Sequence, residues 1–281
     1  MNTCVVSTEW LAERLEAPDI VILDASWHLP PSKRDGHAEY LAEHIPRALF
    51  FDIDEIADTE NPLPHMLPSP EKFASRMRKM GIGDGKDVIV YDSHGLYSAA
   101  RAWWMFRVFG HDEVAVLDGG LPKWKAEGRP LAEGPPGPVQ ERHFTARFNS
   151  LMVCDKHEVR RVLETREAQV ADARSPARFT GAEPEPRAGL RSGHMPGARN
   201  LHYATLINPD GTLKDASTIK AALQQAGIDL SRPVITSCGS GVTAAIVSLG
   251  LELVGHADHA VYDGSWSEWG ADPELPVTTE G

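Results

Sequence analysis

A single cysteine, Cys238, lies between a β-rich run at residues 233–237 and a loop that contains Gly239 and Gly241. An apolar run with the composition of a helix follows this loop directly. In that order of elements, the amide N–H groups of the loop and the positive end of the helix dipole point toward the thiol and stabilise negative charge there. Such a site favours the thiolate over the thiol, and Cys238 is therefore a candidate nucleophile or sulfur carrier.

The composition restricts the classes of protein to which this chain can belong. Of its 281 residues, 42% are hydrophobic and 24% are charged, which is ordinary for a globular protein of about two domains. The formal net charge of −12 argues against a nucleic-acid-binding protein, which would carry a basic surface. No apolar run approaches the ~18 residues of a membrane helix, and the N-terminus lacks a signal sequence, so we expect a cytoplasmic protein without a membrane segment.

The chain contains three cysteines, Cys4, Cys154 and Cys238, which are far apart and form no Cys-x-x-Cys pair. This pattern predicts neither a disulfide framework nor a zinc site, and it suits a reducing compartment. We expect Cys4 and Cys154 to be inert. No motif implies a metal or an organic cofactor.

The chain contains two copies of one pattern. Four landmarks recur in the same order, and each lies between 145 and 150 positions from its counterpart. The matched positions are Asp24 with Asp172, His44 with His194, Asp92 with Cys238, and Asp118 with Asp263. Four ordered landmarks at a nearly constant offset indicate tandem duplication of one domain rather than a short repeat.

A stretch rich in proline and glycine at residues 131–140 separates the two copies. Such a stretch cannot hold a helix or an inner strand, so it predicts an extended linker. We expect an N-terminal domain at residues 1–132, a linker at 133–149 and a C-terminal domain at 150–281.

Each half alternates short β-rich runs with helical patterns. The predicted strands of the first half are 20–24, 88–91 and 114–117, and helices are predicted near 69–80, 98–109, 155–163, 217–226 and 242–254. This alternation predicts α/β domains, each with a mostly parallel sheet covered by helices on both faces. Ligands bind at the carboxyl ends of the strands in such domains, and Cys238 occupies such an end.

The loop from Cys238 to Thr243, the tandem halves, and the segments at 189–197 and 262–270 together resemble the rhodanese superfamily. The resemblance covers nearly the whole chain and implies two rhodanese-like domains. Gly239 and Ser240 stand where thiosulfate-specific members carry basic residues, which resembles the members that act on 3-mercaptopyruvate. The implied activity is a sulfurtransferase that moves sulfur through a Cys238 persulfide to a thiophilic acceptor (cyanide, a thiol or thioredoxin) and releases pyruvate.

A persulfide on Cys238 carries negative charge on its terminal sulfur and needs hydrogen-bond donors. The backbone amides of the following loop can form such a nest, and the glycines permit the dihedral angles that it requires. The residues of this candidate nest are Gly239, Ser240, Gly241, Val242 and Thr243.

A keto acid also needs cations for its carboxylate, and Arg178 and Arg187 lie in one loop-rich stretch. Arginine binds a carboxylate through two parallel hydrogen bonds. The resemblance matches both residues to substrate-binding arginines of the family. The alternative is that they are surface residues paired with Glu183 or Glu185.

The resemblance further implies a Ser–His–Asp arrangement made of Ser240, His65 and Asp54. In this arrangement Asp54 orients His65, and His65 polarises the hydroxyl of Ser240, which then moves a proton as sulfur leaves. Two of these residues come from the first half, which explains why a second domain is retained. The alternative is that His65 and Asp54 only cap local turns.

Two positions point to non-catalytic roles. Asp92 stands where the second half has Cys238, and a carboxylate cannot carry sulfur, so we expect the first domain to be inactive. His44 and His194 occur in the same His-x-Pro context in both halves. This repetition favours a structural role, in which the side chain makes a hydrogen bond that holds the turn.

Three other functions compete with the main hypothesis. A thiosulfate:cyanide sulfurtransferase would use the same cysteine, but the uncharged Gly239 and Ser240 disfavour a dianionic donor. A phosphatase of the Cys-x₅-Arg type needs an arginine where this chain has Ala244, and without it the transferred phosphoryl group loses its main fixed cation. A persulfide relay or docking module would use Cys238 without small-molecule turnover.

Overall fold

The computed structural model describes residues 3–280, which form two compact units. Unit 1 contains residues 3–59, 67–149 and 208–213, and unit 2 contains residues 60–66, 150–207 and 214–280. The units follow the two halves of the duplication, with two short segments grouped in the opposite unit. The domain boundaries expected at 132 and 149 stay predictions.

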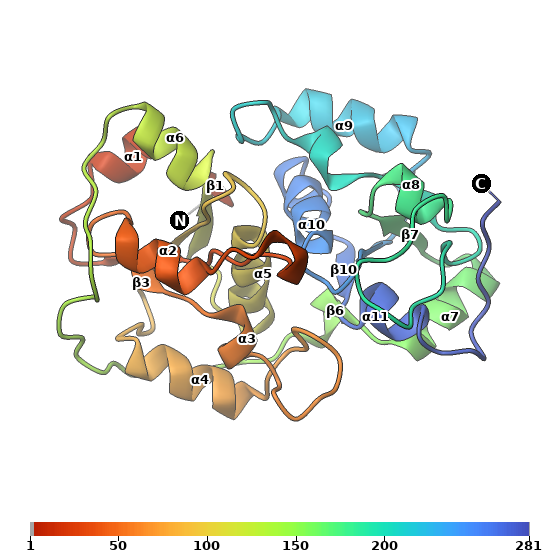
Figure 1. Ribbon diagram of the computed structural model, residues 1–281, viewed down its shortest axis with the longest axis horizontal. Helices are drawn as coiled ribbons and strands as arrows, with labels where there is room; N and C mark the ends of the chain where they lie inside the picture. The colour runs from red at the N-terminus through yellow and green to blue at the C-terminus, as the bar shows by residue number, and fades with distance from the viewer. Residues whose placement is uncertain (1–2, 281) are drawn as a thin grey trace. The chain divides into compact units, whose positions relative to one another are not determined.

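Each unit is built on a five-stranded sheet in which every neighbouring pair is parallel (Figure 1). In spatial order, the strands of unit 1 are β1 (Val5–Val6), β5 (Val114–Leu117), β4 (Asp87–Tyr91), β2 (Ile20–Asp24) and β3 (Leu49–Phe50). Those of unit 2 are β6 (Val153–Cys154), β10 (His259–Tyr262), β9 (Val234–Ser237), β7 (Gln169–Asp172) and β8 (Arg199–Asn200). The two sheets have the same strand order, which confirms the predicted fold class.

The helices occupy corresponding places in the two halves. The α-helices of unit 1 are α1 (Thr8–Ala12), α2 (Gly36–Ala42), α3 (Ile53–Ile56), α4 (Pro70–Lys79), α5 (Ala99–Val108) and α6 (Gly120–Ala126). Those of unit 2 are α7 (Lys156–Thr165), α8 (Pro176–Phe179), α9 (Ala216–Gln225), α10 (Ala244–Leu253) and α11 (Ser265–Trp269). Three short 3₁₀ turns complete the described helices, at Pro30–Ser32, Ser150–Met152 and Tyr203–Leu206.

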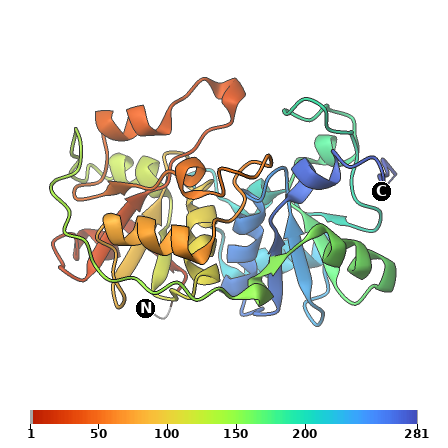
Figure 2. The same ribbon diagram turned by 90° about the horizontal axis from the view of Figure 1, so that it is seen from below.

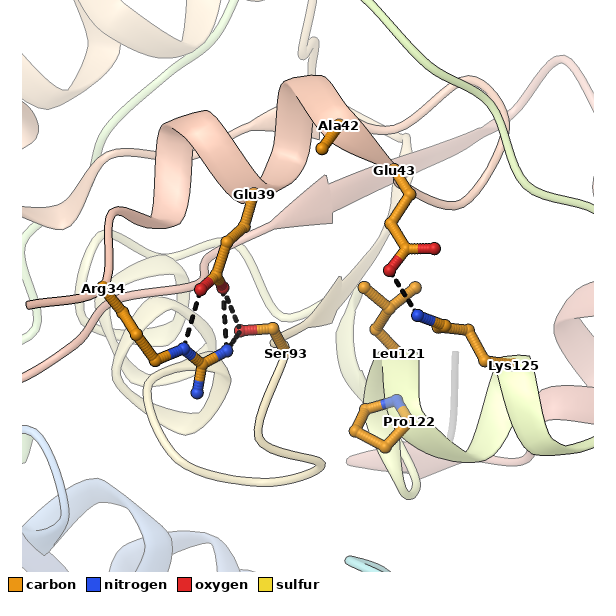
Figure 3. Close-up of a pocket in the computed structure, with 8 residues that line it drawn as sticks. All are labelled: Arg34, Glu39, Ala42, Glu43, Ser93, Leu121, Pro122 and Lys125. Carbon is orange, nitrogen blue, oxygen red and sulfur yellow. Dashed lines mark hydrogen bonds and ion pairs between the residues drawn. The ribbon is translucent and has the colours of Figure 1, made fainter. Parts of the chain in front are cut away.

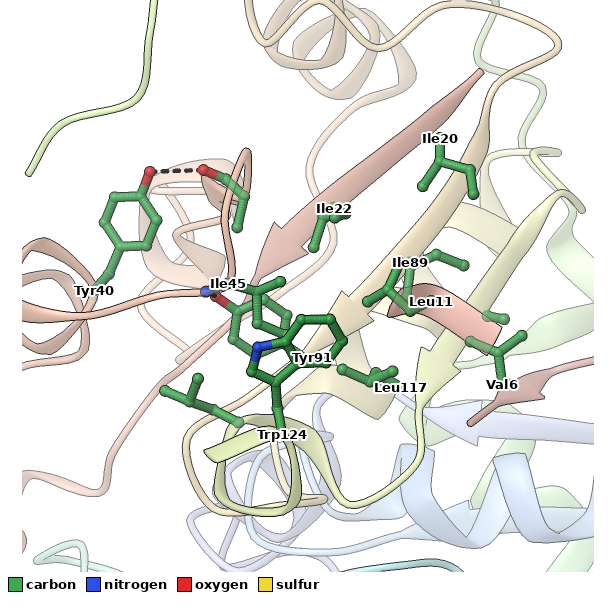
Figure 4. Close-up of a cluster of buried hydrophobic side chains, with 13 residues drawn as sticks. Val6, Leu11, Ile20, Ile22, Tyr40, Ile45, Ile89, Tyr91, Leu117 and Trp124 are labelled. Atoms are coloured by element: carbon green, nitrogen blue, oxygen red, sulfur yellow. Dashed lines mark hydrogen bonds between the residues drawn. The ribbon is translucent and has the colours of Figure 1, made fainter. Parts of the chain in front are cut away.

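The alternation of side chains along β4 explains how helices cover both faces of the sheet in unit 1. Ile89 and Tyr91 face a buried cluster with Tyr40 of α2 and Trp124 of α6 (Figure 4). The intervening residues of β4 point to the other face, which α5 covers. Each large apolar side chain that is fully buried in this way stabilises the unit by about 2 kcal/mol.

Unit 2 repeats this arrangement. Val159 of α7 and Trp266 and Trp269 of α11 pack with Val170 and Ile235 on one face of the sheet, and α10 contacts β9 and β10. Helices α7 and α10 can be followed in Figures 1 and 2. Both tryptophans are fully buried.

Local sequence signals set several helix starts. The Ser69 hydroxyl accepts a hydrogen bond from the Lys72 amide at 3.2 Å, and the Asp155 carboxylate accepts one from the Glu158 amide at 2.9 Å. Helix α10 begins at Ala244, two residues later than expected, because Thr243 is its N-cap and the preceding residue belongs to the Cys238 loop.

The histidine side chains of the two His-x-Pro turns make hydrogen bonds to backbone carbonyl oxygens, as expected. His44 Nδ1 lies 2.7 Å from the Tyr40 carbonyl oxygen, and His194 Nδ1 lies 2.8 Å from that of Phe179. Both imidazoles are buried, which confirms their structural role. None of the helices in residues 3–280 is long and apolar enough to cross a bilayer.

Candidate active site

Cys238 directly follows β9, at the carboxyl edge of the unit 2 sheet. The residue is buried, with 2% of its surface exposed, and its thiol is free. Five residues separate it from the first residue of α10. The sequence-based placement of this cysteine at a strand end and before a helix is therefore correct.

Hydrogen bonds connect the loop that starts at Cys238 to the start of α11. The amides of Cys238 and Gly241 donate hydrogen bonds to Ser265 Oγ at 3.2 and 3.1 Å, and this hydroxyl donates to the Tyr262 carbonyl at 2.8 Å. The Trp266 amide donates to the Cys238 carbonyl at 3.0 Å. These bonds fix the direction of the loop backbone beside the thiol.

Two serines of α11 were not among the expected site residues. Ser265 has φ +49°, a conformation that non-glycine residues rarely adopt, and Ser267 Oγ donates to the Gly239 carbonyl at 2.7 Å. A signal for Ser265 was present in the duplication, because the matched position in the first half is Gly120, with φ +52°.

Gly241 has a different contact from the one expected. Its φ of +75° explains why glycine stands there, but its amide donates to Ser265 Oγ. Its observed role is to hold the loop. The other loop amides, including those of Val242 and Thr243, stay the predicted donors to sulfur.

The matching loop of unit 1 contains a nest of amides of the expected kind. Asp92 directly follows β4, and its carboxylate accepts hydrogen bonds from the amides of His94, Tyr97 and Ala99 at 2.9, 2.6 and 2.9 Å. The Asp92 carbonyl accepts from the Leu121 amide at 3.1 Å, as the Cys238 carbonyl accepts from Trp266. The two loops therefore share this anchor of their first carbonyl, and in unit 1 the amides of the loop bind the side chain of the first residue.

Arg178 and Arg187 both lie next to Gly239. A Cβ atom added to this glycine would lie 3.0 Å from Arg178 Nη2 and 3.8 Å from Arg187 Nη1. The structure thus brings together the two arginines that the sequence suggested, at the residue that follows Cys238. Glycine at position 239 leaves room for both guanidinium groups.

A buried carboxylate fixes the direction of Arg178. Glu185 accepts hydrogen bonds from Arg178 Nη2 at 2.5 Å and from Arg174 Nη1 at 2.7 Å. Arg174 also binds Asp172 at 2.6 Å and lies over the Trp266 ring at 4.1 Å. The pairing with Glu185 that the alternative interpretation gave for Arg178 therefore occurs, while Arg178 Nη2 still lies beside Gly239.

His65 belongs to unit 2, where its Nε2 lies 3.3 Å from Arg187 Nη2. A guanidinium can only donate, so Nε2 is the unprotonated nitrogen and the proton resides on Nδ1. His65 is buried and has φ +63°. In this tautomer the lone pair of Nε2 accepts the hydrogen bond from Arg187, which orients the imidazole toward a substrate-binding candidate.

Asp54 belongs to unit 1, where its Oδ2 accepts a hydrogen bond from Trp27 Nε1 at 2.8 Å. It does not cap α3, because the Asp52 carboxylate accepts from the amides of Asp54 and Glu55. Ser240 is buried in unit 2. The relay of Asp54, His65 and Ser240 stays a prediction.

Burial controls two further titratable groups in unit 2. Burial, together with the charge of Arg178, holds the pKa of His202 below its ordinary value, so this imidazole is neutral beside the arginine. Burial also raises the pKa of the Cys154 thiol to about 12. Cys154 is therefore protonated at neutral pH, as expected for an inert thiol.

Unit 1 has a cavity of about 520 Å³ lined in part by Ser93, the residue after Asp92 (Figure 3). Its cations are already paired: Arg34 binds Glu39 at 2.7 Å, and Lys125 forms an ion pair with Glu43. In residues 3–280, no group of three or more His, Cys, Asp or Glu side chains has the arrangement of a metal site.

Comparison with known proteins gives a consistent result. The Rhodanese-like domain family matches residues 7–127 and 155–272. The chain is 45% identical to the 3-mercaptopyruvate sulfurtransferase of Escherichia coli, with 98% of each chain covered, and 41% identical to the thiosulfate sulfurtransferase of Rattus norvegicus, with 98% of this chain and 95% of the relative covered. The crystal structure of SseA from Escherichia coli matches with a TM-score of 0.87 and 42% identity over 94% of this chain and 99% of that one.

Proposed function

Because the chain belongs to the rhodanese family, we propose that it moves a sulfur atom from 3-mercaptopyruvate through a persulfide on Cys238 to a thiophilic acceptor. The observation that carries this proposal is the position of Gly239, which directly follows the cysteine and has the guanidinium groups of Arg178 and Arg187 beside it. A cysteine whose neighbouring residue lies beside two guanidinium groups suits a donor that contains both sulfur and a carboxylate.

In the binding step, Arg178 and Arg187 hold the carboxylate and the keto oxygen of 3-mercaptopyruvate. Glu185 keeps Arg178 in place, so little side-chain entropy is lost when substrate binds. Holding the keto acid by its carboxylate end brings its sulfur toward Cys238, which converts an encounter in solution into an oriented attack.

In the chemical step, the Cys238 thiolate attacks the sulfur of the donor and a sulfur–sulfur bond forms. The carbon–sulfur bond breaks, and its electron pair enters the enolate of pyruvate, where the keto oxygen faces the arginines. The proton of the donor thiol moves to the enolate carbon, which leaves pyruvate and an anionic persulfide. His65 and Ser240 are the proposed groups for this proton transfer, and Asp54 is the proposed orienting carboxylate.

The loop amides stabilise the persulfide. Donors of the nest are proposed to be the amides of Gly239, Ser240, Val242 and Thr243, by analogy with the amides that bind the Asp92 carboxylate in unit 1. Preorganised donors favour charge that develops during the reaction, because they need no reorganisation at that moment.

In the second half-reaction an acceptor removes the outer sulfur. Cyanide attacks it to give thiocyanate and returns the Cys238 thiolate. Reduced thioredoxin, the proposed cellular acceptor, supplies two electrons and two protons, so that hydrogen sulfide leaves and thioredoxin becomes a disulfide. Turnover with thioredoxin and 3-mercaptopyruvate, measured as hydrogen sulfide release, tests this partner, and no release above the rate with a small thiol would rule it out.

The proposed location is the cytoplasm. Three free thiols in the described structure support a reducing compartment. Fractionation of the source cells, followed by detection of the chain with an antibody, tests this location, and recovery with an organelle would exclude it.

Intact mass spectrometry tests the proposed intermediate. Incubation with 3-mercaptopyruvate should add one sulfur atom to the protein, and cyanide should remove it. The Cys238→Ser variant should gain nothing, whereas Cys4→Ser should gain the sulfur as the native chain does. An added sulfur that persists in Cys238→Ser would place the intermediate elsewhere.

Thiosulfate is the second candidate donor, because a relative with 41% identity is named for it. The residues after the cysteine, Gly239 and Ser240, carry no charge for a dianion. We therefore expect a higher kcat/KM with 3-mercaptopyruvate than with thiosulfate. The reverse ranking would leave the persulfide mechanism in place and overturn the donor.

A further inference from the structure

Unit 2 has a second cavity, of about 650 Å³, at the opposite edge of its sheet from Cys238. It lies at the amino ends of the strands: Gln169 begins β7, Arg199 begins β8, and Arg232 lies two residues before β9. The end of α7 provides another side, with Arg166 directly after the helix. A cavity of this volume accommodates a molecule of drug or cofactor size.

Three arginines line this cavity, and two of their side chains have no protein partner. Within residues 3–280, the guanidinium groups of Arg166 and Arg199 make no ion pair or hydrogen bond. Arg232 donates to the Arg166 carbonyl. Asp229 is the one acidic residue among those that line the cavity, and hydrogen bonds from Ser231, together with the charge of Arg232, lower its pKa. The Asp229 carboxylate accepts hydrogen bonds from the amide and hydroxyl of Ser231.

This concentration of positive charge contrasts with the rest of the molecule, whose formal net charge is −12. In the catalytic half, Arg174 and Arg178 are paired with buried carboxylates, and in unit 1 Arg34 is paired with Glu39. Unpaired arginines in a hollow raise the local concentration of anions, because their field is not cancelled by neighbours.

The backbone at Arg166 supplies an independent observation. This residue follows the last residue of α7 and adopts φ +60°, a left-handed conformation that glycine or asparagine usually provides at a helix end. Arginine in this conformation is strained by about 1 kcal/mol relative to glycine. This backbone conformation places an arginine, rather than the usual glycine, among the residues that line the cavity.

The remaining wall of the cavity is apolar. It includes Val162 and Leu163 of α7, Ala168 and Pro196. Gly227 lies next to Arg199: a Cβ atom added to this glycine would be 3.6 Å from Arg199 Nε. The cavity therefore combines three planar cations with a surface that suits a ring or an aliphatic group.

We propose that this cavity binds an organic phosphate that carries two or more charged phosphate oxygens beside an apolar ring. Guanidinium groups match the geometry of phosphate oxygens and bind them through paired hydrogen bonds. Several cations within one cavity favour a multiply charged group over a single carboxylate. This site is independent of the proposed sulfur transfer, because it uses none of the residues near Cys238.

Calorimetry with ADP, pyrophosphate and adenosine tests the proposal on the full chain. ADP should bind most tightly, pyrophosphate more weakly because it lacks the ring, and adenosine not measurably. Affinity for ADP should fall steeply as salt rises, since the contacts are ionic. Equal affinity for ADP and pyrophosphate would show that the apolar wall does not bind a ring. Absence of ADP binding at millimolar concentration would overturn the whole proposal.

Two variants locate the binding. Arg166→Gly removes a guanidinium group, so the affinity for ADP should fall about tenfold. It also removes the strain of a left-handed arginine, so the melting temperature should stay equal or rise. Arg199→Gln should lower the affinity for ADP by a similar factor. The control is Arg160→Gln, because Arg160 is exposed on α7 and pairs with Glu164. If this control lowers the affinity for ADP as much as Arg166→Gly does, the site is not this cavity. The same conclusion follows if neither cavity variant lowers the affinity.

Discussion

The loop after β4 in unit 1 and the loop after β9 in unit 2 begin at matched positions with different chemistry. The first begins with Asp92, whose carboxylate is already bound by three amides. The second is one residue shorter and begins with Cys238, a thiol that acquires its charge by losing a proton. Matched loops thus begin with a carboxylate that is bound by amides in one half and with the proposed nucleophile in the other.

A second pair of matched positions differs in how a buried carboxylate is treated. Asp172 ends β7 and is bound by the guanidinium of Arg174. Asp24 ends β2, but the residue two positions on is Ser26, and burial raises the pKa of Asp24 to about 6. Unit 2 therefore contains a chain of arginines and carboxylates from Asp172 to Arg178, whereas at the matched position of unit 1 the carboxylate of Asp24 has the Ser26 amide as partner and, within the described residues, no arginine.

The largest expected effect comes from making the two loops alike. Cys238→Asp should abolish turnover, with a loss of about 1,000-fold or more, and leave the melting temperature nearly unchanged, because the unit 1 loop shows that this backbone binds a carboxylate. Steady-state rates with 3-mercaptopyruvate and a thermal melt measure both. The reciprocal Asp92→Cys change, made in the same chain, should restore no activity, because Arg34 is paired with Glu39. Recovery of turnover would show that the two loops are chemically equivalent.

The next effect concerns the buried acids. The pKa of Asp24 is about 6 in the folded state, above its ordinary value of 3.8, so the folded protein holds this proton more tightly and loses stability as pH rises through that range. Asp24→Asn removes the ionisation and should raise the free energy of unfolding at pH 8 by roughly 2–3 kcal/mol, with little gain at pH 4. Urea unfolding at both pH values measures this.

Asp172→Asn is the matched control for that experiment. It removes one of the two carboxylates that bind the buried Arg174 and leaves only Glu185, so it should destabilise the chain by about 3 kcal/mol at neutral pH. A gain in stability from Asp172→Asn, or a loss from Asp24→Asn at pH 8, would contradict the difference inferred between the two halves.

The smallest effect is expected at Ser265. Ser265→Gly introduces the residue of the matched position, Gly120, which has the same backbone conformation. It removes the hydroxyl that accepts from the Cys238 and Gly241 amides, so kcat should fall by about tenfold with KM nearly constant. Ser267→Ala, which keeps the loop amides bound to Ser265, should have a weaker effect on kcat. An unchanged kcat in Ser265→Gly would mean that the loop holds its shape without this hydroxyl.

Much of the fold was predictable because it depends on local patterns. The runs at 20–24 and 114–117 are β2 and β5 with the expected bounds, and the predicted tandem α/β fold and membership of the rhodanese superfamily are confirmed. The predicted class of enzyme agrees with relatives at 41–45% identity. Buried strands and capped helices are short-range features, so a window of a few residues contains their signal.

The site was predictable only in part. Cys238, Arg178 and Arg187 were identified from their residue types and the resemblance, and the structure places both arginines beside Gly239. Ser265 was not identified, because the signal at this position was its difference from the matched Gly120 and not the chemistry of its side chain, which depends on its partners. The same holds for Glu185, whose function depends on reaching Arg174 and Arg178 together.

By itself, the sequence determined that one domain had been duplicated and that the second copy has Cys238 where the first has Asp92. It did so because residue identity and spacing are written directly in the chain. The tertiary structure decided which backbone groups face Cys238, which arginines reach the neighbouring residue and which carboxylate holds them. Those contacts join residues far apart in the chain, and their geometry arises only when the strands and helices pack.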